Sequence, residues 1–161
     1  MKRLTAALCA LCLLLCAGCG SGKAQSGNGS SNGGANPFVD YATLAEAEQA
    51  AGFTLTAPGS VDGFDAPHVQ VMNGKMLQLV FPGGEQRLII RKAAGKDDVS
   101  GDYNSYPETK TIRVNGADVT LRGADGKVST AVWCAGGCSY AVMSDVPLAA
   151  DVMTDLVAEI S

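Results

Sequence analysis

Apolar and polar residues alternate in pieces of strand length between residues 68 and 144. Short turn signals, such as Asn73-Gly74, Asn115-Gly116 and Gly136-Gly137, separate these pieces. A period of two is typical of strands that bury one face. Short connections force neighbouring strands to be antiparallel, because a parallel crossover needs a dozen or more residues. The pattern therefore predicts an antiparallel meander of about seven strands: HVQVM, KMLQLVF, QRLIIRK, TKTIRVN, ADVTLRG, KVSTAVWC and CSYAVMS.

The first predicted hairpin has two possible registers. The turn at Asn73-Gly74 contains either two or three residues, and the choice decides which side chains share a face. With three residues, Val71 lies opposite Leu77 and Val69 lies opposite Leu79. This register gathers the apolar side chains on one face of the sheet, and we therefore expect it.

A short helix is predicted before the first of these strands. Thr43 is suited to cap it, and Glu46, three residues later, is suited to complete a capping box. Gly52 follows the last apolar residues and is expected to end the helix.

A second helix is predicted at residues 147–161, PLAADVMTDLVAEIS. Ser144 or Asp145 is suited to cap it, and Pro147 suits the first turn. Its apolar residues recur at four-residue steps and predict one buried face: Leu148, Val152, Leu156 and Ile160. An apolar helix face needs a partner surface, so we expect an α+β fold in which both helices pack on one face of the sheet.

The start of the chain carries an export signal. Lys2 and Arg3 precede a run of about fifteen apolar or small residues, which suits a cleaved signal peptide better than a spanning helix. Ala17-Gly18-Cys19 then resembles the lipobox of bacterial lipoproteins, in which the cysteine receives a diacylglycerol and becomes the new N-terminus. We expect residues 1–18 to be a lipoprotein signal peptide and Cys19 to be lipidated. Ordinary secretory cleavage and a retained anchor are the alternatives.

The expected mature chain consists of a tether and one domain. Residues 19–37 are the acylated cysteine followed by Gly, Ser and Asn with a single charge, Lys23, which is typical of a flexible linker. Residues 38–161 suffice for a single extracytoplasmic domain. This organisation predicts a protein that is lipid-anchored to the extracytoplasmic face of the cell membrane.

Composition and charge exclude one class of partner. The chain is 47% hydrophobic, with 12 basic and 16 acidic residues and a net charge of −4. Removal of Lys2 and Arg3 leaves ten basic residues and a net charge of −6. A nucleic-acid-binding surface needs the opposite sign, so we expect no nucleic-acid partner.

The order of the segments also resembles a domain family of unknown function. Gram-positive bacteria place this family outside the membrane, as the C-terminal part of anti-sigma factors and as lipoproteins. The resemblance rests on Ala-Gly-Phe at 51–53, on APGSVDGF at 57–64, on the meander with Trp133 and Tyr140 flanking a glycine turn, and on the closing helix. It implies a sensing, binding or interaction module and carries over no catalytic residue.

Cys134 and Cys138 are the candidate disulfide pair of the domain. A three-residue loop between them would place the two thiols face to face, in a compartment where disulfides persist. A two-residue Gly136-Gly137 turn would instead send the thiols to opposite faces. We favour the disulfide. Two inert thiols, or a redox or metal role, are the alternatives.

Other candidate chemistry has a structural interpretation. Asp98, Ser100, Asp102 and Asn104 have a spacing that suits calcium, but the glycine and glutamate of an EF-hand loop stand at the wrong positions. We therefore expect these side chains to bond their own backbone. His68, the single histidine, is expected opposite Val80 as a structural residue. We expect Trp133 and Tyr140 to pack as a cross-strand pair. Arg87 and Arg91 are expected to share a solvent-exposed face of the sheet.

These observations predict a non-catalytic binding, sensing or interaction module of the cell envelope, without a cofactor or metal. The partner would be an envelope protein or a small ligand, bound through the sheet face that the helices leave free. An envelope hydrolase is the main alternative, and it would use paired carboxylates such as Asp97 with Asp98 or Asp62 with Asp65. A purely structural surface lipoprotein is the third.

Overall fold

The structure is a computed structural model, and it describes residues 36–161. The expected signal peptide (1–18), the expected lipidation site Cys19 and nearly all of the expected tether (19–37) lie outside the described residues. These three predictions are therefore not tested by the structure.

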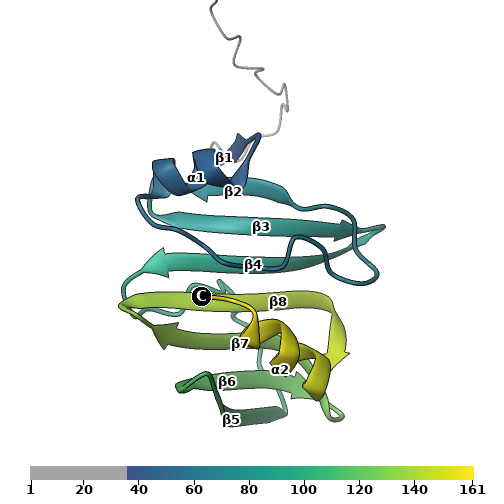
Figure 1. Cartoon of the computed structure of the whole chain (residues 1–161). Coiled ribbons are helices and arrows are strands. Elements are labelled where there is room, and N and C mark those ends of the chain that lie inside the picture. The colour runs from purple at the N-terminus through teal and green to yellow at the C-terminus, as the bar shows by residue number, and fades with distance from the viewer. Residues whose placement is uncertain (1–35) are drawn as a thin grey trace, which may run out of the picture. The chain divides into compact units, whose positions relative to one another are not determined.

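Eight antiparallel strands form one open sheet in the order β1-β2-β3-β4-β8-β7-β6-β5 (Figure 1). The first four strands form one meander and the last four form another, and the two meanders join where β4 pairs with β8. The strands span these residues: β1 Phe38–Tyr41, β2 His68–Met72, β3 Met76–Gly83, β4 Gln86–Ala94, β5 Glu108–Val114, β6 Ala117–Ala124, β7 Lys127–Ala135 and β8 Cys138–Ala149.

The predicted α+β meander is confirmed, with eight strands in place of about seven. The additional strand is β1, which pairs with β2 so that Phe38 lies opposite Met72. It has only four residues and no hairpin turn leads from it to β2, because a helix intervenes. The expected register of the first hairpin is also confirmed, since Val71 lies opposite Leu77 and Val69 lies opposite Leu79.

The first helix, α1 (Leu44–Ala51), has the ends that its sequence predicts. The Thr43 hydroxyl accepts a hydrogen bond from the Glu46 backbone N–H, and the Glu46 carboxylate accepts one from the Thr43 backbone N–H. Gly52 ends the helix in the left-handed conformation, with φ of 79°. This conformation costs glycine little because it has no Cβ.

The second helix, α2 (Ala150–Ala158), starts later than predicted, because strand β8 continues as far as Ala149. Both expected caps have other partners: the Ser144 hydroxyl donates to the Val146 carbonyl, and the Asp145 carboxylate accepts from Arg87. Pro147 is tolerated within the strand because β4 pairs with β8 only as far as Ser144.

The buried face of α2 also differs from the prediction. Its buried side chains are Met153, Leu156 and Val157, and Ile160 beyond the helix is buried as well. Val152 was expected to face the core, but it is 50% exposed. The observed spacing of three and four residues is the usual apolar stripe of a helix on a globular core.

Both helices cover the same face of the sheet, as predicted, and we call it the helix face (Figure 1). Helix α1 packs on β2 and β3, and α2 packs on β7 and β8. The segment between α1 and β2 also crosses this face. The core lies beneath these three elements, and its fully buried side chains include Leu77, Phe81, Leu88, Ile90, Val119, Val142 and Met153.

The opposite face, which we call the loop face, is covered by residues 95–107. The guanidinium of Arg91 donates from Nη1 to the Val99 and Ser100 carbonyls, at 3.2 Å and 2.6 Å. On the other side, the Thr130 hydroxyl of β7 donates to the Asp102 carboxylate. The sheet face that the helices leave free is therefore partly covered, and the loop leaves a groove on each side. Within residues 36–161, no helix has the length and apolar character needed to cross a bilayer.

Candidate functional site

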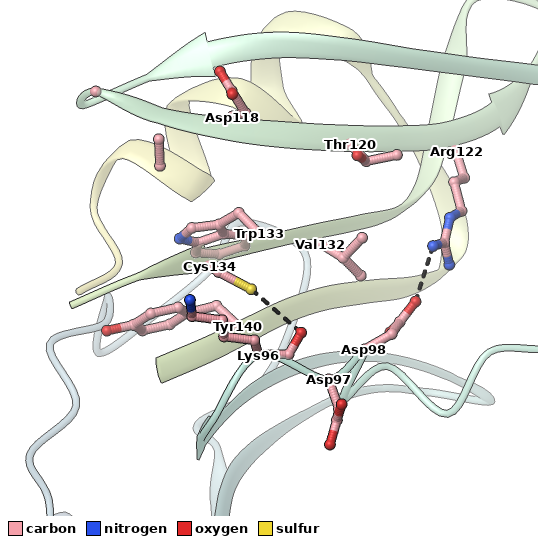
Figure 2. Close-up of a pocket in the computed structure, with 12 residues that line it drawn as sticks. Lys96, Asp97, Asp98, Asp118, Thr120, Arg122, Val132, Trp133, Cys134 and Tyr140 are labelled. Atoms are coloured by element: carbon pink, nitrogen blue, oxygen red, sulfur yellow. Dashed lines mark hydrogen bonds and ion pairs between the residues drawn. The ribbon is translucent and has the colours of Figure 1, made fainter. Parts of the chain in front are cut away.

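The larger groove on the loop face has a volume of about 530 Å³ and lies between the start of the 95–107 loop and strands β6 and β7 (Figure 2). We call it the β6 groove. Its volume falls within the range of small-molecule sites. Its lining consists of Lys96, Asp97, Asp98, Gly116, Ala117, Asp118, Thr120, Arg122, Val132, Trp133, Cys134 and Tyr140.

The period of two along β6 brings three of these side chains to one face. Asp118, Thr120 and Arg122 are alternate residues of ADVTLRG and therefore point to the same side of the sheet. Val132 lies opposite Thr120 on β7. These residues were not among the candidates predicted from the sequence, although the same alternation that predicted the strand also predicts their shared face.

Two ion pairs hold charges at the groove. Arg122 Nη2 lies 2.9 Å from Asp98 Oδ2, and Arg113 Nη1 lies 3.0 Å from Asp118 Oδ1. Figure 2 shows Asp98 directed towards Arg122, whereas Asp97 points away from it. Asp97 and Asp98 therefore do not converge, as expected for adjacent residues of extended chain.

The pKa of Asp98 is lowered from its ordinary value. Burial of the carboxylate acts to raise the pKa, and hydrogen bonds from Ser100 and Arg122, together with the charge of Arg122, outweigh it. The Asp98 carboxylate is consequently ionised at neutral pH. It does not have the raised pKa that a general acid requires.

Cys134 and Cys138 are free, and the two-residue turn explains why. Gly136 and Gly137 form the turn, so that Cys134 lies opposite Ser139 and Cys138 lies opposite Ala135. Their side chains point to opposite faces of the sheet, and the favoured disulfide is not formed. The Cys134 thiol lies in the β6 groove, 3.6 Å from the Lys96 carbonyl oxygen.

The second groove on the loop face has a volume of about 480 Å³ and lies on the other side of the 95–107 loop. Asp102 lines it and organises its hydrogen bonds. Asp102 Oδ2 accepts from the Thr130 and Tyr106 hydroxyls, each at 2.6 Å. Asp102 Oδ1 accepts from the backbone and side-chain N–H groups of Asn104, at 3.0 Å and 2.8 Å.

The side chains with the calcium-like spacing form local turns, as predicted from the sequence. The Asp98 carboxylate accepts from Ser100, and the Asp102 carboxylate accepts from Asn104. Burial acts to raise the pKa of Asp102, and hydrogen bonds from Thr130, Tyr106 and Asn104 lower it below its ordinary value. No group of three or more metal-ligating side chains occurs within residues 36–161.

On the helix face, the predicted aromatic pair is joined by a buried lysine and a third aromatic ring. Trp133 and Tyr140 are stacked, as predicted, with ring centroids 5.1 Å apart. The Lys92 ammonium lies 4.9 Å from the Tyr140 ring centroid and 5.9 Å from that of Phe53. Lys92 is only 7% exposed, and a cation over an aromatic ring is attracted by its quadrupole. This role of Lys92 was not predicted from the sequence, because Phe53 comes from a distant segment.

The remaining candidates lie on the surface or at its edge. His68 is exposed and lies opposite Val80, in the expected register. Arg87 is exposed and pairs with Asp145 at 3.2 Å, whereas Arg91 is partly buried under the loop. Burial lowers the pKa of Arg91 from its ordinary value. Asp62 and Asp65 are exposed, and Asp62 lines a groove beside α2.

Comparisons of the chain with protein-family models, with curated proteins and with solved structures found no match. The resemblance to the extracytoplasmic domain family and to bacterial lipoproteins therefore stays a prediction.

Proposed function

We propose that this chain is a lipid-anchored, non-catalytic domain of the cell envelope, and that it binds a polar ligand or partner protein in the β6 groove. The observation that carries the binding proposal is the groove itself. It is an open depression of about 530 Å³ on the sheet, and it presents both signs of charge, a hydroxyl and the apolar side chain of Val132. Such a lining can orient a polar ligand by hydrogen bonds while Val132 contributes apolar contact.

The charges of the groove favour binding over acid-base catalysis. Asp98 is paired with Arg122, and Asp118 is paired with Arg113. A general acid and a general base need two groups of suitable pKa that converge on one substrate. The pKa of Asp98 is lowered, and Asp97 points away from Asp98. This arrangement supports a binding module over the hydrolase alternative.

The anchor is proposed from the sequence, since Cys19 lies outside the described residues. Mass spectrometry of the membrane fraction of expressing cells tests it. We expect a mature N-terminal peptide that begins at Cys19 and carries acyl chains. An intact N-terminus, or a mature chain recovered without acyl groups, would reject the lipid anchor.

A matched pair of variants tests the groove. Thr120→Trp places a large ring on the groove wall, whereas Thr54→Trp places the same ring at an exposed position between α1 and β2, away from the groove. The tagged full-length variants are retrieved from cells, and the bound proteins and small molecules are quantified. We expect at least one species to be retained by Thr54→Trp and lost by Thr120→Trp. Equal retention of every species by both variants would contradict binding in the β6 groove.

A further inference from the structure

A third groove lies on the helix face, where the segment between α1 and β2 passes beside α2 (Figure 1). It has a volume of about 330 Å³, and we call it the α2 groove. It is separate from the β6 groove, which lies on the other face of the sheet. Its lining consists of Pro58, Ser60, Val61, Asp62, Leu148, Val152, Asp155, Leu156 and Glu159.

The floor of the α2 groove is apolar. Val152 is 50% exposed, although it belongs to a helix whose other large apolar residues, Met153, Leu156 and Val157, are buried. A single exposed apolar side chain needs no explanation. Here, however, Val152 adjoins Pro58, Val61 and Leu148 in one depression, and an apolar depression of this kind favours the docking of an apolar group.

The rim of the same groove is acidic. Asp155 comes from α2, Glu159 is the residue directly after α2, and Asp62 comes from the facing segment. No basic residue lines the groove. None of these three carboxylates takes part in an ion pair within residues 36–161. Asp151 and Asp155 of α2 and Glu159 at its C-cap follow one another at four-residue intervals, and like charges at that spacing destabilise a helix. Glu159 also stands at the C-terminal end, where the helix dipole disfavours an anion.

From this charge complementarity we infer that the α2 groove docks a basic amphipathic peptide segment of a partner protein, with an aliphatic side chain on the floor and lysine or arginine residues against the rim. The cationic groups would meet unpaired carboxylates and relieve the repulsion along α2. The volume is at the lower end of the range for ligand sites, which suits one or two side chains of an extended segment.

Two other occupants fit the groove less well. A fatty acid or an anionic lipid would bring a negative headgroup against three carboxylates, which repel it. A second copy of this chain, docked by the same surface around a two-fold axis, would bring two acidic rims together. A basic peptide is therefore the occupant that the charges favour. The inference is independent of the proposed ligand of the β6 groove.

Three synthetic peptides and the full-length chain in a mild non-ionic detergent test the proposal by fluorescence anisotropy. The first peptide alternates leucine with lysine, the second has serine in place of leucine, and the third has glutamate in place of lysine. We expect saturable binding of the first peptide, weakened by added salt because exposed ion pairs are screened. We expect much weaker binding of the second and none of the third.

Two double variants with the same change in net charge locate the site. Asp155→Lys with Glu159→Lys reverses the rim, and about tenfold weaker binding is expected because two exposed ion pairs are replaced by repulsions. Glu85→Lys with Asp40→Lys is the control, since both residues are exposed and line none of the three grooves described above. A change of less than about twofold is expected for the control. Lysine at position 159 suits the helix end, so the test variant is expected to stay folded.

Three results would overturn the inference. The first is the absence of saturable binding of the leucine-lysine peptide. The second is equal weakening by the two double variants, which would mean that only overall charge attracts the peptide. The third is equal binding of the leucine-lysine and serine-lysine peptides, which would mean that the apolar floor plays no part.

Discussion

Replacement of Asp102 by alanine tests whether its carboxylate fixes the 95–107 loop to the sheet. Asp102 Oδ2 accepts hydrogen bonds from the Thr130 and Tyr106 hydroxyls, each at 2.6 Å. Thr130 is only 1% exposed, so water cannot readily replace the lost acceptor. The Asp102→Ala substitution therefore leaves buried donors without their charged partner.

The expected cost follows from these contacts. A hydrogen bond to a charged group contributes about 1.5–3 kcal/mol, and a buried polar group left unpaired costs about 1–3 kcal/mol. The Thr130 and Tyr106 hydroxyl oxygens lie 3.4 Å apart, so one hydroxyl can donate to the other after the carboxylate is removed. This partial compensation leaves one donor unpaired, and we expect a loss of about 2–3 kcal/mol in the free energy of unfolding.

Urea unfolding followed by tryptophan fluorescence measures this loss. Trp133 is the single tryptophan, and it is 7% exposed, so its emission reports on exposure of the core. The control is Asp97→Ala, because Asp97 lies in the same loop, is exposed and has no side-chain hydrogen bond within residues 36–161. We expect the control to change the unfolding free energy by less than about 0.5 kcal/mol.

A double-mutant cycle with Thr130→Val identifies the partner. If the two side chains act through their hydrogen bond, the losses from Asp102→Ala and Thr130→Val are not additive, with a coupling energy of about 1 kcal/mol or more. Equal urea midpoints for Asp102→Ala and Asp97→Ala would refute the reasoning. Full additivity in the cycle would show that the Thr130 contact contributes nothing to the loss.

Two further predictions concern the sheet and its loop. Gly123→Ala is expected to lower the free energy of unfolding by more than about 3 kcal/mol, because a Cβ there would meet the Lys127 carbonyl oxygen. The control is Gly59→Ala, whose Cβ would meet no atom within 4 Å. Thermal unfolding compares the two variants, and equal melting temperatures would contradict the expectation. Because the pKa values of Asp98 and Asp102 are lowered, their contribution to stability is present above the unfolded pKa of about 3.9 and is lost as pH falls through the folded values. At pH values below about 4, the urea concentration at the unfolding midpoint should therefore decrease, and it should decrease less steeply in an Asp102→Asn variant. Parallel pH profiles for the variant and the parent would contradict the assignment of Asp102.

The sequence predicts those parts of the fold that depend on neighbours along the chain. Alternation and turn residues gave the antiparallel strands, the register of Val71 with Leu77 and the capping box of Thr43. The predicted start of α2 was wrong because both expected caps, Ser144 and Asp145, form hydrogen bonds with partners other than the helix. Strand β1 was missed because four residues without an adjoining hairpin carry little pattern.

The candidate site depends on contacts between distant segments, which the sequence does not encode locally. The 95–107 loop is polar and has no strand or helix period, yet Arg91 and Thr130 hold it against the sheet. The β6 groove exists because this loop covers only part of that face. The alternation of Asp118, Thr120 and Arg122 could have predicted one wall of the groove. The contact between Lys96 and Cys134 could not be predicted, because the two residues come from distant segments.

The junction of the two meanders has a consequence for how the chain folds. Among the strands of residues 36–161, β4 and β8 are the one pair of sheet neighbours that are not consecutive in the chain. Every other ladder closes a shorter stretch of chain, and loop closure becomes slower and entropically more costly with length. We therefore expect the hairpins of each half to form early. The docking of Leu88–Ala94 along Cys138–Ser144 would then be the step that sets the folding rate.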